Sequence, residues 1–118
     1  MTSSRDVIYT IALAELNAGQ EAKENGNIGQ ARVCARRGCG MAIEHWLGLF
    51  PNKNWGASAM SMLAKLQEDS TIPKEIRDAA ERLTKKVDQN FETGIEEDPL
   101  KDGEKIIEYF LDKKNFKE

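Results

Sequence analysis

The sequence predicts an all-α protein: an up-and-down bundle of four long helices and one short helix, forming a single domain over residues 1–118. Apolar residues recur at helical spacing almost throughout, whereas the alternating runs and hairpin turns that mark strands are nearly absent. Charged residues make up 31% of the chain and hydrophobic residues 40%, a balance typical of amphipathic helices with solvated outer faces.

Residues 5–24 predict the first helix. Its apolar side is formed by Ile8, Ile11, Ala12, Leu16, Ala18 and Ala22. The turn signal Asn25-Gly26-Asn27 follows, in which Gly26 suits the left-handed conformation after a helix and Asn27 can cap the next helix. Because this connection is short, we expect the first two helices to be antiparallel neighbours.

Residues 27–49 predict the second helix, and its small residues predict the centre of the bundle. Small side chains on one face of a helix let a neighbouring backbone approach closely. The stripe consists of Ala31, Ala35, Gly38 and Ala42. The residues expected to thicken the packing face on its flanks are Cys34, Met41, Trp46 and Leu49. A glycine and then a proline close the helix between positions 48 and 51.

Three shorter apolar patterns follow. A short helix is expected near residues 58–66, with one face formed by Met60, Leu63, Ala64 and Gln67. Pro73 suits the first position of a fourth helix, whose stripe is Ile76, Ala79, Ala80, Leu83, Val87 and Phe91. Asp98 and Pro99 open the last segment, but Gly103 predicts that its stable helix starts only near Asp102. Its buried side is Ile106, Ile107, Phe110 and Leu111.

The composition limits the partners that the chain can attract. Its formal net charge is −3 and its isoelectric point is near 5.3, so the whole domain lacks the basic field of a general nucleic-acid binder, although a local basic patch stays open. The first residues lack the layout of a secretory signal, and no apolar run approaches the roughly 20 residues that span a bilayer. We therefore expect a cytoplasmic protein with no membrane contact.

The two cysteines predict neither a disulfide nor a metal site. Cys34 and Cys39 stand five positions apart on one predicted helix, so they point about 140° apart and cannot bridge. No second pair of cysteines or histidines completes a zinc site, because the chain holds one histidine. We expect reduced, buried cysteines, no metal and no cofactor.

The second helix also carries the candidate anion-binding residues. Arg32 and Arg36 lie one turn apart, and two guanidiniums at that spacing can clamp a phosphate, with Arg37 beside them. The alternative is that the arginines pair with Glu21 or Glu24 on the first helix.

Aromatic residues gather around the end of the second helix. Trp46, Phe50 and Trp55 predict a satellite core, with a dimer patch or a stacking platform for a base as alternatives. His45, beside Trp46, lies near the helix C-terminus, where the helix dipole favours it. We expect a structural role for this histidine.

The order of these segments resembles that of a known family. The second helix starts with Gly-Asn-Ile and continues over residues 31–47 as Ala-Arg-Val-Cys-Ala-Arg-Arg-Gly-Cys-Gly-Met-Ala-Ile-Glu-His-Trp-Leu. Later segments read Ser-Met-Leu-Ala-Lys-Leu, Ile-Pro-Lys-Glu-Ile and Asp-Pro-Leu-Lys-Asp-Gly-Glu-Lys-Ile-Ile. Over residues 5–113 the chain resembles HEPN domains, whose core helix has a similar alanine-rich run.

The resemblance implies a helical bundle that dimerises, binds nucleotides or RNA and accompanies minimal nucleotidyltransferases, as in toxin–antitoxin systems. Many HEPN domains are ribonucleases with an Arg, four to six residues and then a His, late in the bundle. In this chain no histidine follows the second helix, and seven residues separate Arg37 from His45. The nuclease residues therefore do not carry over.

The sequence thus predicts a non-catalytic, HEPN-like homodimer that binds a nucleotide or partners a minimal nucleotidyltransferase, with Arg32, Arg36, Arg37 and Trp46 as its ligand-binding residues. The alternatives are an atypical ribonuclease that uses His45 and Arg37, and a protein-interaction bundle without a small ligand. On one helix, His45 and Arg37 are about 12 Å apart in rise, too far to share a phosphate unless the arginine reaches across. The acidic balance argues against general RNA binding.

Overall fold

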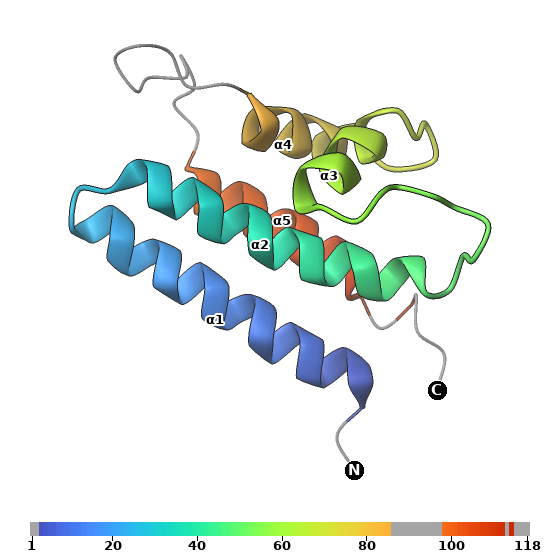
Figure 1. Ribbon diagram of the computed structural model, residues 1–118, viewed down its shortest axis with the longest axis horizontal. Helices are drawn as coiled ribbons and strands as arrows, with labels where there is room; N and C mark the ends of the chain where they lie inside the picture. The colour runs from blue at the N-terminus through green and yellow to red at the C-terminus, as the bar shows by residue number, and fades with distance from the viewer. Residues whose placement is uncertain (1–2, 86–97, 113, 115–118) are drawn as a thin grey trace.

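The computed structural model describes residues 3–85, 98–112 and 114, which form five helices and no strand (Figure 1). The all-α prediction is confirmed for this part of the chain. Two helices are long, with 21 and 20 residues, and three are shorter, with 9, 11 and 12 residues, where the sequence predicts four long ones. They are α1 (Ser4–Glu24), α2 (Ile28–Leu47), α3 (Ala59–Gln67), α4 (Lys74–Thr84) and α5 (Pro99–Phe110).

The helix α2 is the centre of the arrangement. It contacts α1, α3, α4 and α5, and α5 lies alongside it (Figure 1). α1 is its antiparallel neighbour, as the short turn predicts, and α3 and α4 pack on each other on the opposite side. Within the described ranges, no helix is both long enough and apolar enough to cross a bilayer.

Local signals set the helix ends. The Asn27 side chain accepts a hydrogen bond from the backbone N–H of Gln30 at 3.0 Å and so caps α2, as predicted. Gly26 before it has a φ of 79°, which glycine adopts at little cost. Ser58 and Ser61 form a reciprocal capping box at the start of α3.

The small-residue stripe of α2 is buried, as predicted, and so are Cys34 and Trp46 beside it. Its members are Ala31, Ala35, Gly38 and Ala42. A Cβ atom on Gly38 would stand 3.1 Å from Cδ1 of Ile107 in α5 and 3.2 Å from the carbonyl oxygen of Ala12 in α1. The missing side chain therefore lets three helices meet at this point.

The face that α3 buries is only partly the predicted one, since Leu63 is buried and Gln67 is half-buried as part of it. Met60 is 46% exposed and Ala64 is exposed as well, whereas Met62, Leu63 and Leu66 are buried. Apolar residues are so frequent in this segment that they fit several helical faces, and periodicity alone does not choose between them. The choice is made by α2 and α4, which both pack against this helix.

Two other predicted packing faces are partly wrong. Ile11 is 43% exposed and Ala18 is exposed, because α2 and α5 cover only the side of α1 that holds Ala12 and Leu16. Leu49 is 47% exposed, since α2 ends at Leu47 and the chain turns away before reaching it.

α4 has the predicted buried stripe as far as the structure describes it. Ile76, Ala79, Ala80 and Leu83 are buried. Pro73 is the N-cap residue and not the first helical residue, a difference of one position. The predicted stripe members Val87 and Phe91 lie outside the described residues.

α5 starts at Pro99, three residues before the predicted Asp102. The Asp98 side chain caps it by accepting a hydrogen bond from the backbone of the first turn at 2.9 Å. Gly103 does not delay the helix, because it serves packing: a Cβ atom there would lie 3.2 Å from the Cβ atom of Ala35 in α2.

Replacing Gly40 of α2 with alanine should loosen the contact with α3. A Cβ atom at this position would lie 2.9 Å from the Cβ atom of Ala59, which cannot swing away. We expect Gly40→Ala to lower the free energy of unfolding by about 1–2 kcal/mol, even after the gain in helix propensity. Gly29→Ala, where the nearest atom is 3.8 Å away, should leave stability equal or higher. Urea unfolding followed by circular dichroism compares the two, and equal effects would contradict this packing role.

Candidate functional site

Arg32 and Arg36 reach from α2 to the C-terminal end of α4. Nη2 of Arg32 donates to the backbone carbonyls of Arg82, Leu83 and Lys85 at 3.0, 3.2 and 2.9 Å. Nη1 of Arg36 donates to the carbonyl of Leu83 at 3.3 Å. The last carbonyls of a helix lack partners within that helix, so the two guanidiniums cap α4 from a neighbouring helix.

These contacts differ from the alternative pairing predicted for the arginines. In the described part of the chain, no ion pair joins Arg32 or Arg36 to Glu21 or Glu24. Arg32 is only 6% exposed, and its Nε is buried without a hydrogen-bond partner. Burial lowers the pKa of both guanidiniums, and the charge of Arg36 lowers that of Arg32 further. Of the predicted two-arginine clamp, solvent reaches chiefly the half-buried Arg36.

An ion pair between a half-buried arginine and a buried aspartate lies beside this cap. Asp102 of α5 is 2% exposed and accepts two hydrogen bonds from Arg82 of α4, at 2.9 Å from Nε and 2.8 Å from Nη2. The bidentate pair joins α4 to α5, and Arg32 joins the same end of α4 to α2. Asp102 was predicted only as the start of a helix and not as a buried residue; the available signal was its position on the same helical face as the buried Ile106.

The candidate residues are spread along α2. Arg37 is exposed, and His45 is half-buried in the last turn of the helix, eight positions and about 12 Å of rise away. Arg32 and Trp46 are fourteen positions apart, which corresponds to about 21 Å. A single nucleotide therefore cannot use all four predicted ligand-binding residues at once.

Trp46 is the centre of an aromatic cluster. Its ring centroid lies 4.6 Å from that of Phe50, 5.4 Å from that of Trp55 and 4.9 Å from that of Phe110 in α5. Both tryptophans are 7% exposed, so their predicted burial is confirmed, but they belong to the main hydrophobic core and not to a satellite core. The flat face of Trp46 is thus covered by protein and not by solvent.

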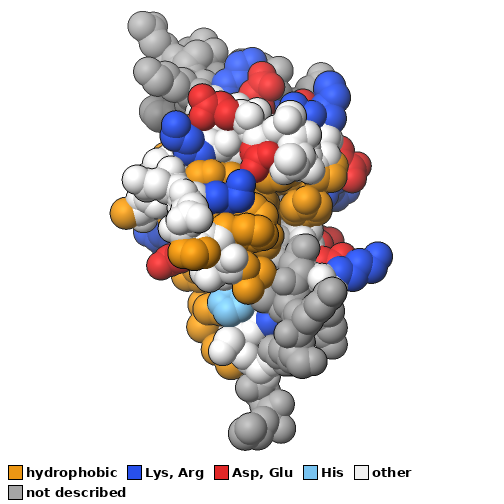
Figure 2. All heavy atoms as spheres, turned by 90° about the vertical axis from the view of Figure 1, so that its right-hand side faces the viewer, with side chains coloured by type: hydrophobic (Ala, Val, Ile, Leu, Met, Phe, Trp, Pro, Cys, Tyr) orange, Lys and Arg blue, Asp and Glu red, His pale blue; other side chains and the backbone are white. Residues whose placement is uncertain are grey.

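Next to this cluster, Leu49 and the cluster member Phe50 are exposed at the surface. They are 47% and 37% exposed, and we call them the Leu49–Phe50 surface. Nζ of Lys53 lies 5.7 Å from the Phe50 ring centroid and forms an ion pair with Asp69 at 3.4 Å. Figure 2 shows hydrophobic side chains gathered on the face where α2 ends and the loop to α3 passes. Exposed aromatic side chains on a packed support are typical of protein-contact surfaces.

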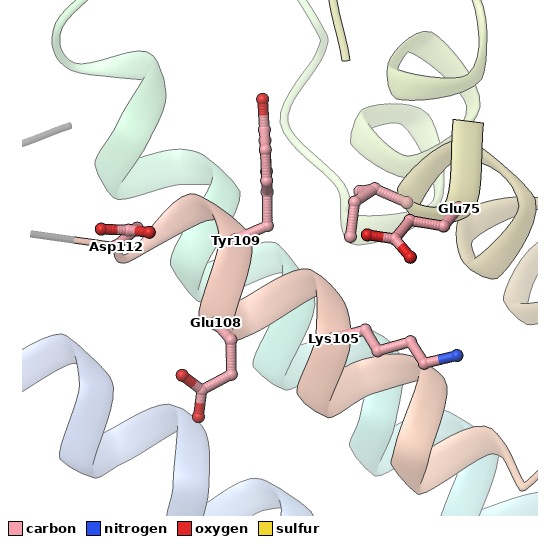
Figure 3. Close-up of a pocket in the computed structure, with 6 residues that line it drawn as sticks. Glu75, Lys105, Glu108, Tyr109 and Asp112 are labelled. Atoms are coloured by element: carbon pink, nitrogen blue, oxygen red, sulfur yellow. The ribbon is translucent and has the colours of Figure 1, made fainter. Parts of the chain in front are cut away.

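An open pocket of about 330 Å³ lies between α4 and α5, and its lining is mostly charged. It is lined by Glu75, Ile76, Lys105, Glu108, Tyr109 and Asp112. Figure 3 shows that Glu108 and Tyr109 leave α5 in different directions and that Asp112, beyond the end of this helix, lies apart from both. Glu108 points toward α1, where it accepts a hydrogen bond from Tyr9. The pocket residues thus do not converge on one reacting atom.

Both cysteines are buried and form no disulfide, as predicted. Burial, followed by the nearby charge of Asp102, raises the pKa of the Cys39 thiol, which keeps it protonated at neutral pH. Among the described residues, no group of three or more histidine, cysteine, aspartate or glutamate side chains could hold a metal ion.

Comparisons of the chain with protein-family models, with curated proteins and with solved structures found no match. The resemblance to HEPN domains rests on the sequence segments quoted above and stays a prediction.

The arginine cap predicts a large difference between two neighbouring arginines. Arg32→Met removes three hydrogen bonds to carbonyls at the end of α4, so we expect a loss of about 2–4 kcal/mol in the free energy of unfolding. The exposed Arg37→Met is the matched control and should change it by less than about 0.5 kcal/mol. Chemical denaturation measures both, and similar midpoints would show that Arg32 does not hold α4.

The loop after α3, whose Asp69 pairs with Lys53 beside the Leu49–Phe50 surface, should contribute less to folding stability in acid. Hydrogen bonds from Thr71, and then the contact with Lys53, lower the pKa of Asp69 against the opposing effect of burial. A carboxyl whose folded pKa is lowered adds stability above its unfolded pKa of about 4, and this stability is lost as pH falls through the folded value. Asp69→Asn should therefore flatten the dependence of melting temperature on pH below about 4. If the melting temperatures of the variant and the wild type fell equally with pH, Asp69 would not contribute to stability in this way.

Proposed function

We propose that this chain is a non-catalytic, HEPN-like binding module that forms a homodimer and binds a protein, with a minimal nucleotidyltransferase as the expected kind of partner. The observation that carries the proposal is the exposure of Leu49 and of Phe50, whose ring packs on Trp46, which in turn packs on Trp55. A rigid support reduces the entropy lost when such side chains are covered by a partner. Removing their apolar area from water contributes about 25 cal/mol per Å², from which the cost of association is subtracted.

The positions of the arginines favour a protein partner over a nucleotide. Arg32 is committed to the carbonyls of α4, and Arg36 donates to one of the same carbonyls. A phosphate at Arg32 would have to displace contacts that hold α4. The apolar side chains of the Leu49–Phe50 surface can be covered without breaking any contact of this kind.

A nucleotide site and a ribonuclease remain the two alternative functions. The nucleotide site would use Arg36 and Arg37, the two candidate arginines that solvent reaches. The ribonuclease would use His45 with Arg37, and it needs the arginine to reach along about 12 Å of helix or a second copy to complete the site.

Partner binding can be tested by co-expression with a minimal nucleotidyltransferase encoded beside this chain, followed by co-purification and titration. We expect Leu49→Ser and Phe50→Ser each to weaken binding by about tenfold or more, because they remove apolar area at the contact. Met60→Ser, at an equally exposed methionine on α3, is the matched control and should bind like the wild type. Equal binding by all the variants would contradict the role of the Leu49–Phe50 surface.

The same protein distinguishes the alternatives. A rise of several degrees in melting temperature with ATP or GTP, abolished by Arg36→Ala, would replace the proposal with a nucleotide site. Cleavage of RNA oligomers that is lost in His45→Ala would establish a ribonuclease instead.

A further inference from the structure

α1 has a second apolar face, which no other helix in the described ranges covers. It lies at the edge of the bundle, with α2 and α5 packed on only one of its sides (Figure 1). Six exposed residues follow one another at alternating spacings of three and four, the pattern of a seam between two helices. This α1 outer stripe consists of Ser4, Val7, Ile11, Ala14, Ala18 and Glu21.

The stripe leaves substantial apolar surface in water. Val7 is 46% exposed and Ile11 is 43% exposed, and the exposed Ala14 and Ala18 continue the row for two more turns. The two large residues lie in its N-terminal half and the two small ones in its C-terminal half.

We propose that the α1 outer stripe binds the same stripe of a second copy of this chain, with the two helices antiparallel about a two-fold axis between Ile11 and Ala14. Such an axis places residues opposite each other when their numbers add to 25. Val7 then faces Ala18 of the second copy, and Ile11 faces its Ala14. Each large side chain meets a small one, so the two helix axes can approach to about 8 Å.

Charge also matches in this arrangement. Glu21 lies near the C-terminal end of its own helix, where the helix dipole disfavours an acidic side chain. The antiparallel axis places Glu21 opposite Ser4 of the second copy, the first residue of α1, where the helix dipole is positive. A parallel pair would instead set Glu21 against Glu21 and Ile11 against Ile11. Size and charge therefore both favour the antiparallel pair.

This inference deepens the homodimer part of the proposed function and does not depend on the part that concerns a protein partner. The dimer would use α1, whereas the partner surface is formed by Leu49 and Phe50. The first is measured with the purified chain alone, and the second needs the partner.

A pair of charge substitutions tests the interface and its register. Positions 7 and 18 are eleven residues apart, about 16 Å along one helix, so they cannot pair within one chain. Val7→Glu places a carboxylate in the seam near Glu21 of the second copy, and Ala18→Lys places an ammonium group near its helix N-terminus. We expect each single variant to raise the dimer dissociation constant at least about tenfold in sedimentation equilibrium.

The double variant Val7→Glu/Ala18→Lys should return the constant to within about threefold of the wild type, because the introduced carboxylate and ammonium groups then face each other across the axis. Ala64→Lys, at an exposed position of α3, is the matched control and should dimerise like the wild type. Circular dichroism checks that every variant stays folded.

Three results would overturn the inference. If the wild-type chain were monomeric at all concentrations, there would be no homodimer, and the α1 outer stripe would not bind a second copy. A dimer that both single variants leave intact would place the interface elsewhere while keeping the homodimer. Loss of the dimer in both single variants without recovery in the double variant would exclude the antiparallel register.

Discussion

The packing of the whole bundle depends on how closely α1, α3 and α5 approach α2. At Gly38 the backbone of α1 and a side chain of α5 would both stand about 3 Å from an added Cβ atom, and Gly40 touches α3 in the same way. On α5, Gly103 does the same against Ala35. Close approach at these glycines thus holds α1, α3 and α5 against α2, together with large buried side chains such as Ile43, Leu63 and Phe110. Interiors packed this tightly tolerate little added volume.

Close packing of this kind leaves little room for polar groups, and those that are buried serve the fold. Arg32 spans the gap between α2 and the end of α4, and Asp102 with Arg82 spans the gap between α5 and α4. Each satisfies a group that burial would otherwise leave unpaired. Of the three candidate arginines on α2, Arg32 is therefore buried and bonded to carbonyls of α4. Arg36 and Arg37 reach solvent.

The described residues also expose several large apolar side chains, and four of them form two surfaces. Leu49 and Phe50 extend the aromatic cluster outward at the end of α2, and the outer side of α1 presents Val7 and Ile11. Both are supported by packed elements, so a partner would meet them already ordered. The use of Arg32 and Asp102 inside the fold, together with these exposed apolar side chains, supports the proposed binding role more than a catalytic one.

The sequence by itself determined the described helices, the turn between α1 and α2 and most of the helix caps, since Asn27, Ser58 and Asp98 act within one turn of their own position. It also determined the buried stripe of α2, because small residues at helical spacing have only one face on which to gather. Only the tertiary structure decided which face of α1 and α3 is buried, that Arg32 binds carbonyls some fifty residues away, and that Asp102 is an interior residue. The physical reason is that caps and turns depend on neighbours along the chain, whereas burial and long-range hydrogen bonds depend on which helices pack together.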